Sequence, residues 1–426
     1  MLPKKEPWLG GRASQTGTSI MKDMYNKTDE EKIIEVLERG VANIIPGKEQ
    51  LETLLRSGKK LNVYLGIDPT STRIHLGNAV PLRRLQLFVE LGHNVTFLIG
   101  DFTALIGDTS DKDTERPVLT YEQIEENFKT YREQAEKFLD FSKVTLVHNS
   151  DWLQGINFPG VVKLLRHFTL NDFISRELIK KRLTDGKSVS LPEVLYPVMQ
   201  GYDSWHLDTD IQLGGTDQVF NMQAGRTLQK NLRQKESFII ENEFLPGTDG
   251  RKMSKSWGNG IYLIDKPEDI YGKVMSISDD VIVDYFTLAT SLPMRQISEH
   301  SERLVKKENP MIIKKELAKV IVTELLGEEA AKTAEEHFSA TVVNKTPAED
   351  TAVVKLTNLK LLMDGLVGFS LENNLVESKS EFRRLLEQGG IYLNETRVEK
   401  DATEFILNQG ENVVRLGKRK YLKLVV

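Results

Sequence analysis

The first part of the chain alternates between short apolar runs and amphipathic stretches. Residues 62–67 and 95–99 are apolar runs of strand length, and residues 81–91 between them repeat apolar side chains at helical spacing. A strand, a helix and a second strand in this order form a parallel unit, whose ligands bind beyond the carboxyl ends of the strands. Further strands are predicted at 144–147, 211–213 and 238–240. The pattern therefore predicts one large α/β domain from about Leu61 to Pro246.

Helix starts are marked by capping boxes. Thr28 is followed three residues on by Glu31, and the apolar side chains from Ile33 to Ile44 continue this signal as one helical stripe. A second box at Thr120 begins a polar helix, and a further helical stretch is expected at 158–182. These helices are expected to pack on the strands.

In the last part of the chain, first the spacing of apolar residues changes and then the composition. Beyond Gly258 the apolar spacing is helical, which predicts a second, all-α unit. Residues 341–351 contain Pro347 and few apolar side chains, and they are the best candidate for a linker. Residues 352–426 have a higher density of lysine and arginine than the chain as a whole, and we expect a small third domain there.

Composition narrows the class of protein. A chain of 426 residues exceeds what one hydrophobic core usually organises, and fractions of 39% hydrophobic and 28% charged residues are typical of a globular protein. The absence of cysteine excludes disulfides, thiolate zinc sites and cysteine nucleophiles, and the seven histidines lack the spacing of metal ligands, so no metal site is predicted. Because the net charge is -5, any contact with nucleic acid must use a local basic surface.

The expected location is the cytoplasm. No stretch approaches the roughly 20 apolar residues that a membrane span needs, so no membrane contact is expected. The first twenty residues carry Lys4, Lys5 and Arg12 but lack the apolar region of a secretory signal. We interpret them as a leader, and an organelle transit peptide is the alternative.

The first motif with chemical meaning is Ile74-His75-Leu76-Gly77-Asn78, at the predicted turn between a strand and a helix. Unpaired N–H groups and the partial positive charge of a helix start favour an anion. Gly77 lets a ligand approach the backbone, and His75 and Asn78 add donors. A phosphate would be well held here; the alternative is an ordinary turn with a solvated histidine.

The second motif is Arg251-Lys252-Met253-Ser254-Lys255-Ser256, which follows the turn-rich stretch 246–250. Two lysines and two hydroxyl groups in a mobile loop can neutralise a polyphosphate as its charge redistributes, and the loop can close when the nucleotide is present. A solvated basic loop is the alternative interpretation of this segment alone.

Together the two motifs resemble the paired signatures of the class I aminoacyl-tRNA synthetases, a His-x-Gly-His type element after the first strand and a Lys-Met-Ser-Lys-Ser loop after the last. The resemblance narrows to the bacterial-type tyrosyl-tRNA synthetase family and extends from about Leu61 to Val426. The segments that match this family are Tyr64–Thr70, Leu105–Asp108, Tyr196–Asp203 and Gln212–Gln218.

The resemblance implies a tyrosine-binding pocket. The implied contacts to the phenol group are Tyr64 and Asp203, the implied contacts to the amino group are Asp108, Tyr196 and Gln200, and Gln212 lines the pocket. A site that selects tyrosine over phenylalanine must hydrogen-bond the hydroxyl group, a discrimination for which this enzyme family is itself the standard example. An aspartate and a tyrosine supply an acceptor and a donor for it. Without the resemblance, Tyr196 is equally interpreted as a core aromatic residue and Asp108 as a turn residue.

The resemblance also implies an ATP site and a reaction without an enzyme nucleophile. The implied ATP contacts are Gly66, Asp68, His75, Gly77, Asn78, Gly215, Asp217, Gln218, Lys252, Ser254 and Lys255, of which His75, Asn78, Lys252 and Lys255 are the implied catalytic residues. Tyrosine would attack ATP, which binds with Mg²⁺, and the resulting adenylate would acylate the 3′ end of tRNA(Tyr). Catalysis would rest on positioning and electrostatics. Asn78 departs from the second histidine of the family pattern, because it keeps a donor but cannot be cationic.

The terminal region resembles an S4 RNA-binding domain over Ser378 to Asn394, where a basic helix leads through glycine into a short strand. The expected RNA contacts are Lys379, Arg383 and Arg384. Arginine and lysine side chains on one face bind phosphates with an affinity that falls as the salt concentration rises. A solvated helix surface is the alternative.

The resemblance completes the expected organisation. A homodimer is implied, because part of the chain resembles the insertion that forms the subunit interface in this family. The expected divisions are a leader and helix at 1–60, a Rossmann-like catalytic domain at 61–250 with the insertion at about 113–192, the signature loop and an α-helical anticodon-binding domain at 251–340, a linker at 341–351 and an S4 domain at 352–426.

Two other functions remain open from the sequence. One is a related synthetase that activates another aromatic amino acid, against which Asp203 and the S4-like region argue. The other is a catalytically silent RNA-binding paralogue, against which the intact lysines of the loop argue. The expected function is a tyrosine–tRNA ligase that uses tyrosine, ATP and tRNA(Tyr).

Overall fold

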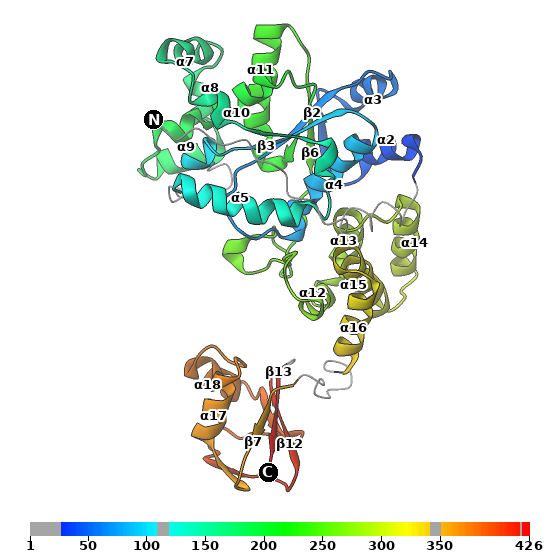
Figure 1. The fold of residues 1–426 in the computed structure, drawn as a ribbon, viewed down its shortest axis with the longest axis vertical. Coiled ribbons are helices and arrows are strands. Elements are labelled where there is room, and N and C mark those ends of the chain that lie inside the picture. Colours follow the sequence, from blue (N-terminus) through cyan, green and yellow to red (C-terminus); the bar gives the residue numbers. More distant parts are fainter. Residues whose placement is uncertain (1–26, 109–118, 341–350, 418–419) are drawn as a thin grey trace. The chain divides into compact units, whose positions relative to one another are not determined.

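The structure is a computed structural model, and it describes residues 27–108, 119–340, 351–417 and 420–426 (Figure 1). The chain divides into two compact units, one up to Glu328 and one from Glu329 to Val426. The predicted leader through residue 26, the start of the predicted insertion and residues 341–350 of the predicted linker lie outside the described residues.

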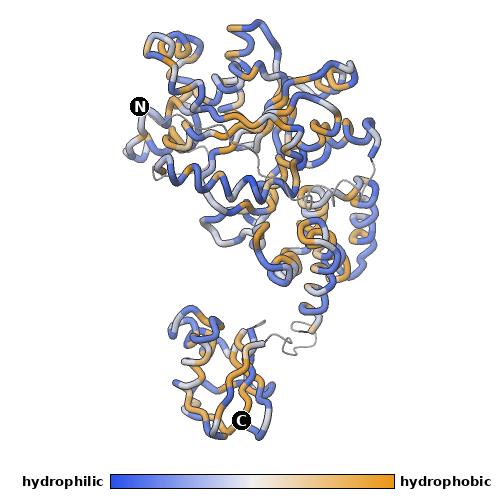
Figure 2. The backbone as a smooth tube through the Cα atoms, in the orientation of Figure 1, coloured by the Kyte–Doolittle hydropathy of each residue, from blue (hydrophilic) through white to orange (hydrophobic). Residues whose placement is uncertain are grey.

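The first unit is built on a six-stranded sheet with the order β1-β6-β5-β2-β3-β4. The neighbouring pairs from β6 to β4 are all parallel, and β1 is antiparallel to β6. The strand bounds are Val41–Ile45 for β1, Asn62–Ile67 for β2, Asn94–Ile99 for β3, Thr145–His148 for β4, Ile211–Gly215 for β5 and Phe238–Asn242 for β6. The five predicted strands and the parallel α/β core are therefore confirmed. Figure 2 shows hydrophobic residues concentrated along the central strands.

The predicted helical stripe from Ile33 to Ile44 is wrong in its second half. Helix α2 (Asp29–Glu38) begins with the predicted capping box at Thr28, but it ends at Glu38 and the chain continues as β1. Gly40 has a φ of 57°, a left-handed conformation that glycine adopts without strain and that breaks the helix. The apolar residues beyond it are largely β-branched and pair with β6, so the sheet starts well before the predicted boundary at residue 61.

Helices surround this sheet (Figure 1). The stretch predicted as helical at 158–182 is three short helices, because the side chain of Thr169 caps a new helix within it. Helices α10 and α11 pack against each other, and α4 contacts β2, β3 and β5. The bounds are Lys48–Arg56 for α3, Leu76–Glu90 for α4, Tyr121–Ala135 for α5, Ser150–Leu153 for α6, Phe158–Leu165 for α7, Leu170–Ile174 for α8, Glu177–Thr184 for α9, Leu191–His206 for α10 and Val219–Arg233 for α11.

The remainder of the first unit is helical. The apolar spacing predicted helices here but as a separate second unit, whereas these helices belong to the same compact unit as the sheet. Helix α12 packs on α15, and α13 contacts α4, α14 and α15. The bounds are Pro267–Met275 for α12, Ile282–Ala289 for α13, Met294–Val305 for α14 and Pro310–Leu326 for α15.

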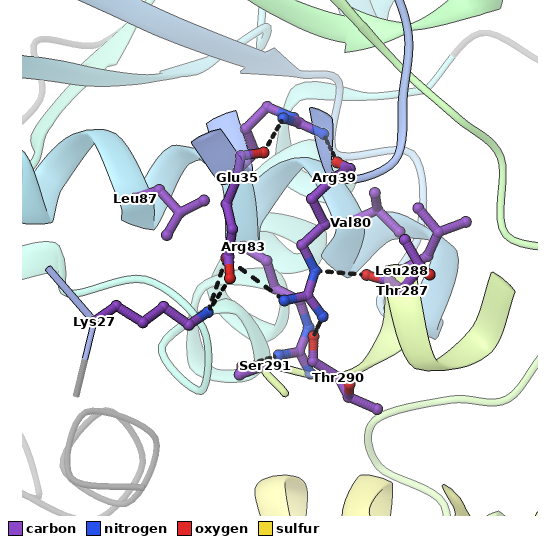
Figure 3. A pocket seen from close by; sticks show the side chains of 11 residues that line it. Lys27, Glu35, Arg39, Val80, Arg83, Leu87, Thr287, Leu288, Thr290 and Ser291 are labelled. Carbon is purple, nitrogen blue, oxygen red and sulfur yellow. Dashed lines mark hydrogen bonds and ion pairs between the residues drawn. The ribbon is translucent and has the colours of Figure 1, made fainter. Parts of the chain in front are cut away.

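Two partly buried arginines connect this helical part to the sheet-bearing part (Figure 3). Arg39, which follows α2, donates to four backbone carbonyls at the carboxyl end of α13, those of Phe286, Thr287, Thr290 and Leu292. Arg83 of α4 donates to Ala289 O at 2.8 Å and pairs with the buried carboxylate of Glu324 at 2.9 Å. Both arginines line a cavity of about 60 Å³, together with Thr287 and Thr290. Because the carboxyl end of a helix attracts cations, we interpret the cluster as a structural clamp.

The second unit is a small α+β fold. Its five-stranded sheet has the order β10-β9-β12-β13-β7, and β8 pairs with β11 in a separate ribbon. Its core includes Leu366, Phe382 and Val414. The bounds are Glu328–Phe338 for α16, Val353–Lys355 for β7, Lys360–Leu362 for β8, Met363–Glu372 for α17, Lys379–Glu387 for α18, Ile391–Leu393 for β9, Thr396–Arg397 for β10, Glu404–Ile406 for β11, Glu411–Leu416 for β12 and Lys420–Val425 for β13. Across the described parts of both units, no helix is long and apolar enough to cross a membrane.

Candidate active site

The first motif forms the start of α4. His75 is the N-cap residue: its Nδ1 accepts from the N–H of Asn78 at 3.2 Å, and Asn78 Oδ1 accepts from the N–H of His75 at 3.3 Å. Burial, followed by the positive charge of Lys252, lowers the pKa of His75 to about 4. The imidazole is therefore neutral near pH 7, and because Nδ1 accepts, Nε2 carries the hydrogen and is a donor.

The second motif lies beside the first. A Cβ atom added to Gly77 would be 3.6 Å from Cβ of Met253, which is buried. Residues just after the loop continue this contact, because the N–H of Leu76 donates to Ile261 O at 2.9 Å and the N–H of Leu263 donates to the carbonyl of residue 74 at 3.0 Å. The two motifs, far apart in the sequence, therefore meet in the fold.

The two lysines of the loop have different surroundings. Lys252 is partly buried, with Nζ 3.2 Å from Asp217 Oδ2 and 3.9 Å from the centre of the Phe244 ring. Lys255 is exposed at the start of a short 3-10 helix, and Ser254 donates its N–H to Asn259 Oδ1 at 2.8 Å. The side chain of Ser256 lies outside the described residues. The motif therefore presents one lysine towards Asp217 and one towards solvent.

Three predicted tyrosine contacts share one face of α10. Tyr196, Gln200 and Asp203 are spaced by four and three residues, which places them on one side of a helix. Tyr64 in β2 and Gln212 in β5 are directly paired across neighbouring parallel strands, and the Tyr64 hydroxyl lies 3.4 Å from Gln212 Oε1. Burial raises the pKa of Tyr64, and Asp203 contributes in the same direction, so the hydroxyl stays protonated and the two residues are electrostatically coupled.

Asp203 is held by two residues that the sequence did not predict. Trp152 Nε1 donates to Asp203 Oδ1 at 2.8 Å, and Asn149 Nδ2 donates to Oδ2 at 3.1 Å. Burial raises the pKa of Asp203 to about 8, although these two hydrogen bonds oppose the rise. Asn149 directly follows β4, at the carboxyl end of a parallel strand, and this position was a signal that could have identified it.

The predicted amino-acid and nucleotide contacts adjoin one another. The hydroxyl of Tyr196 donates to Asp68 Oδ2 at 2.8 Å, and Thr103, which was not predicted, donates to Asp68 Oδ1 at 2.8 Å. Burial and then the charges of Asp68 and Asp108 raise the pKa of Tyr196. A Cβ atom at Gly100 would collide with Asp68 Oδ1 and Thr103 Oγ1, so a larger residue there would have to displace this hydrogen-bonded pair.

Asp108 extends the same arrangement. Gln218 Nε2 donates to Asp108 Oδ2 at 2.6 Å, and Asn221, also not predicted, bonds to Gln218 Oε1 at 3.1 Å. Gly66 lies in β2, and Gly215 ends β5, where a Cβ atom would approach Asp217 Oδ1 to 2.7 Å. Asp68 directly follows β2, and Asp217 and Gln218 follow β5, so these predicted residues lie at the carboxyl end of the sheet, where parallel folds bind ligands. Tyr64 and Gln212 lie within the strands themselves.

The predicted RNA contacts belong to the second unit. Lys379, Arg383 and Arg384 are exposed on α18, whereas Phe382 of the same helix is buried in the core. Ser378 caps the helix by accepting from the N–H of Glu381 at 3.2 Å. The three cations therefore lie on the solvent side of an amphipathic helix.

A parallel sheet with helices around it is a Rossmann-like fold, a class in which many enzymes bind nucleotides beyond the carboxyl ends of the strands. The family described as tRNA synthetases class I (W and Y) matches residues 56–342. The chain belongs to this family, as the resemblance predicted.

Several relatives match almost the whole chain. The tyrosine–tRNA ligase of Thermotoga maritima is 41% identical over 92% of this chain and 97% of its own length. That of Haemophilus influenzae is 38% identical over 93% of this chain and 98% of its own. The similarity therefore reaches well beyond the matched family region and includes the terminal unit.

Solved structures support the fold. An Archaeoglobus fulgidus tyrosyl-tRNA synthetase, in complex with L-tyrosine, covers 72% of this chain and 100% of its own with a TM-score of 0.57 and 23% identity. A truncated mitochondrial tyrosyl-tRNA synthetase of Coccidioides posadasii covers 72% of this chain and 91% of its own with a TM-score of 0.58 and 23% identity. The class I synthetase fold is thus shared.

Proposed function

We propose that this chain, a tyrosine–tRNA ligase like its relatives, activates tyrosine with ATP at the carboxyl end of the sheet and then acylates tRNA(Tyr). The observation that carries the proposed site is the junction of the two motifs, with Met253 packed near Gly77 and Lys252 lowering the pKa of His75. A triphosphate placed at the start of α4 would lie within reach of both motifs.

Tyrosine is recognised in this proposal by groups of opposite hydrogen-bonding character. The phenol group bonds to Tyr64 and Asp203, where Asn149 and Trp152 fix the orientation of the aspartate. The α-ammonium group bonds to Asp108, Tyr196 and Gln200, and Gln212 orients Tyr64. Phenylalanine would displace water from Tyr64 and Asp203 without supplying the hydrogen bonds of a phenol group, which disfavours it.

Activation proceeds without an enzyme nucleophile. A carboxylate oxygen of tyrosine attacks the α-phosphorus of ATP, the bond from that phosphorus to the bridging oxygen breaks, and pyrophosphate leaves with the electron pair. The backbone approaches the nucleotide at Gly66, Gly77 and Gly215, and Asp68, Asp217 and Gln218 contact the nucleotide part. His75, Asn78, Lys252 and Lys255, with Ser254, stabilise the phosphates. Because His75 is neutral, the lysines supply the positive charge.

Magnesium would bind with ATP rather than to a protein cage. In the part of the chain that the structure describes, no group of three or more acidic or histidine side chains could hold a metal ion. Asp217, the carboxylate beside Lys252, is already paired with that lysine. Mg²⁺ would supply charge neutralisation on the phosphate oxygens.

Transfer uses a tRNA hydroxyl as the nucleophile. A ribose hydroxyl at the 3′ end attacks the carbonyl carbon of tyrosyl-adenylate, and AMP leaves. We propose that two regions bind the tRNA. The α-helical domain within 251–340 recognises the anticodon, and the S4 domain binds RNA phosphates through Lys379, Arg383 and Arg384.

A cytoplasmic homodimer is part of the proposal. Phe158, Leu170 and Leu191, all in the region predicted to be the interface insertion, are 80%, 66% and 76% exposed. Exposed large apolar side chains are more frequent at protein interfaces than on the rest of a surface, which supports this part of the proposal.

Pyrophosphate exchange with each of the twenty amino acids tests the function. We expect exchange with tyrosine alone. Preferential exchange with another aromatic amino acid would assign the chain to that substrate, and no exchange in folded protein that still binds tRNA(Tyr) would favour the silent paralogue.

A further inference from the structure

The segment that follows the second motif is fastened to the first motif. Backbone hydrogen bonds join residues 261–263 to residues 74–76 as a short antiparallel bridge. Tyr262, in the middle of this bridge, packs edge-on against the ring of His75, with ring centroids 6.2 Å apart. Any displacement of this segment would therefore disturb the contact with His75.

Asp265 lies at the carboxyl end of the segment 261–265 and holds it by hydrogen bonds and ion pairs. Its carboxylate is 10% exposed and accepts from Arg73 Nη2 at 2.7 Å, Lys273 Nζ at 2.6 Å and the N–H of Tyr262 at 3.0 Å. The guanidinium group of Arg73 also lies 3.9 Å from the centre of the Tyr262 ring. Because Arg73 precedes the first motif and Lys273 lies on α12, Asp265 connects three parts of the fold.

The hydrogen bonds of the loop itself end at Asn259. Asn259 Nδ2 donates to Asp249 Oδ1 at 2.7 Å and to Lys252 O at 3.2 Å, and Asn259 Oδ1 accepts from the N–H of Ser254. These bonds stay within the loop. The carbonyl of Gly260 accepts from Lys273 Nζ at 3.3 Å, and residues 261 and 263 bond to residues 76 and 74 of the first motif. The chain therefore passes at Gly260 from a loop held together by Asn259 to a segment held by Lys273, Asp265 and the first motif.

We propose that Arg73, Asp265 and Lys273 form an anchor that positions the second-motif loop for tyrosine activation. The inference rests on the proposed function, because it assigns the loop lysines to the pyrophosphate that leaves. The anchor residues act through the segment 261–265, so they are positioning residues. The anchor holds the end of the loop against the first motif, and a shift of about 1 Å in catalytic groups can cost on the order of 100-fold in rate.

The two steps of the reaction depend differently on this anchor. Pyrophosphate is present only in the activation step, whereas transfer to tRNA starts from the adenylate. A displaced loop therefore slows the first step and leaves the second step unchanged. A purely structural role would affect both steps and the binding of tyrosine alike.

The first test is Arg73→Met in the full chain, which removes both the ion pair and the contact with Tyr262. We expect the rate constant of tyrosyl-adenylate formation to fall about tenfold. The KM for tyrosine and the rate of transfer from preformed adenylate should each stay within about twofold. Arg73→Lys should recover part of the loss, because it keeps the charge but not the planar stacking. Unchanged activation, or equal losses in both steps, would overturn the anchor.

The second test combines Arg73→Met with Lys255→Ala. If the anchor acts through the loop, Arg73→Met should cost less than about twofold when Lys255 has already been removed. Losses that multiply would show that Arg73 acts independently and would overturn the proposal. Arg56→Met is the matched control, because Arg56 also forms an exposed ion pair, with Glu30, but lies on α3; it should leave activation unchanged.

The outcomes separate the anchor from the proposed function. Absence of tyrosine-dependent exchange in the unmodified protein would contradict the function itself. Normal exchange in the unmodified protein together with normal activation by Arg73→Met would reject the anchor alone.

Discussion

Lys252 Nζ lies 3.2 Å from Asp217 Oδ2, so the loop lysine pairs with a residue that follows the strand β5. The same lysine contributes to the lowered pKa of His75. One cation of the second motif thus acts on two elements of the predicted nucleotide site. The pairing also neutralises part of its charge, and a triphosphate would compete with Asp217 for it.

The first prediction uses this coupling. Replacement of Lys252 by methionine should raise the pKa of His75 from about 4 towards its ordinary value, but only in part, because burial is the larger cause. Titration of the imidazole by NMR measures this change. Tyrosine-dependent exchange should fall roughly 100-fold in the same variant, because a preorganised charge on the leaving phosphates is lost. An unchanged His75 pKa would show that the charge of Lys252 does not act on the imidazole.

The second prediction concerns Asp203 and pH. Its pKa is raised to about 8 in the folded protein, so the folded state holds a proton that the unfolded chain releases near pH 4. Stability from this group is fully present below about pH 4 and is lost as the pH rises towards 8. Urea unfolding of the unliganded protein between pH 4 and 8 should therefore show a steeper fall for the natural chain than for Asp203→Asn. Parallel curves for the two proteins would show that Asp203 does not titrate in this range.

The sequence predicted the parallel core because its strands are short apolar runs with clear ends. It did not predict β1, because the apolar residues on either side of Gly40 fit one helical stripe when the glycine conformation is unknown. The antiparallel pairing with β6 is a contact between residues far apart in the chain, and local spacing carries no signal for it.

The candidate site shows the same limit. The motifs could be located because their residue types are unusual in such spacing, and the spacing of Tyr196, Gln200 and Asp203 fits one helix face. Trp152 and Thr103 were missed, because each is defined only by the carboxylate that it meets from another element. Sequence patterns therefore identify reacting groups more readily than the residues that orient them.

The third prediction tests one of these orienting residues. Trp152→Phe removes the N–H that donates to Asp203 but keeps an aromatic ring. We expect the KM for tyrosine in pyrophosphate exchange to rise about tenfold, since a hydrogen bond to a charged or strongly polar group is worth roughly 1.5 kcal/mol or more. Trp257→Phe is a matched control outside the tyrosine pocket. Equal changes in the two variants would argue against an orienting role for Trp152.

The fourth prediction concerns the clamp between α4 and the helical part. Arg83→Met leaves the carboxylate of Glu324 buried without its ionic partner, and loss of one partner of a buried pair costs about 3–5 kcal/mol. Chemical denaturation should show a loss of that order. The double variant Arg83→Met with Glu324→Gln should recover much of it, because the buried charge is gone. Two losses that simply add would mean that the pair is not the source of the stability.

The last prediction separates the two units. Removal of residues 351–426 deletes the whole second sheet, so the first unit should keep tyrosine-dependent exchange while charging of tRNA(Tyr) weakens.

The RNA contact within the second unit can be tested in the full chain. The double variant Arg383→Ala with Arg384→Ala should reduce the slope of log affinity for tRNA against log salt concentration by about two, because each arginine that neutralises a phosphate releases close to one counterion. Lys360→Ala is the control, since this exposed lysine of the same unit pairs with Glu404 on the β8–β11 ribbon. An unchanged salt dependence in the double variant would place the RNA contact on another face of the unit.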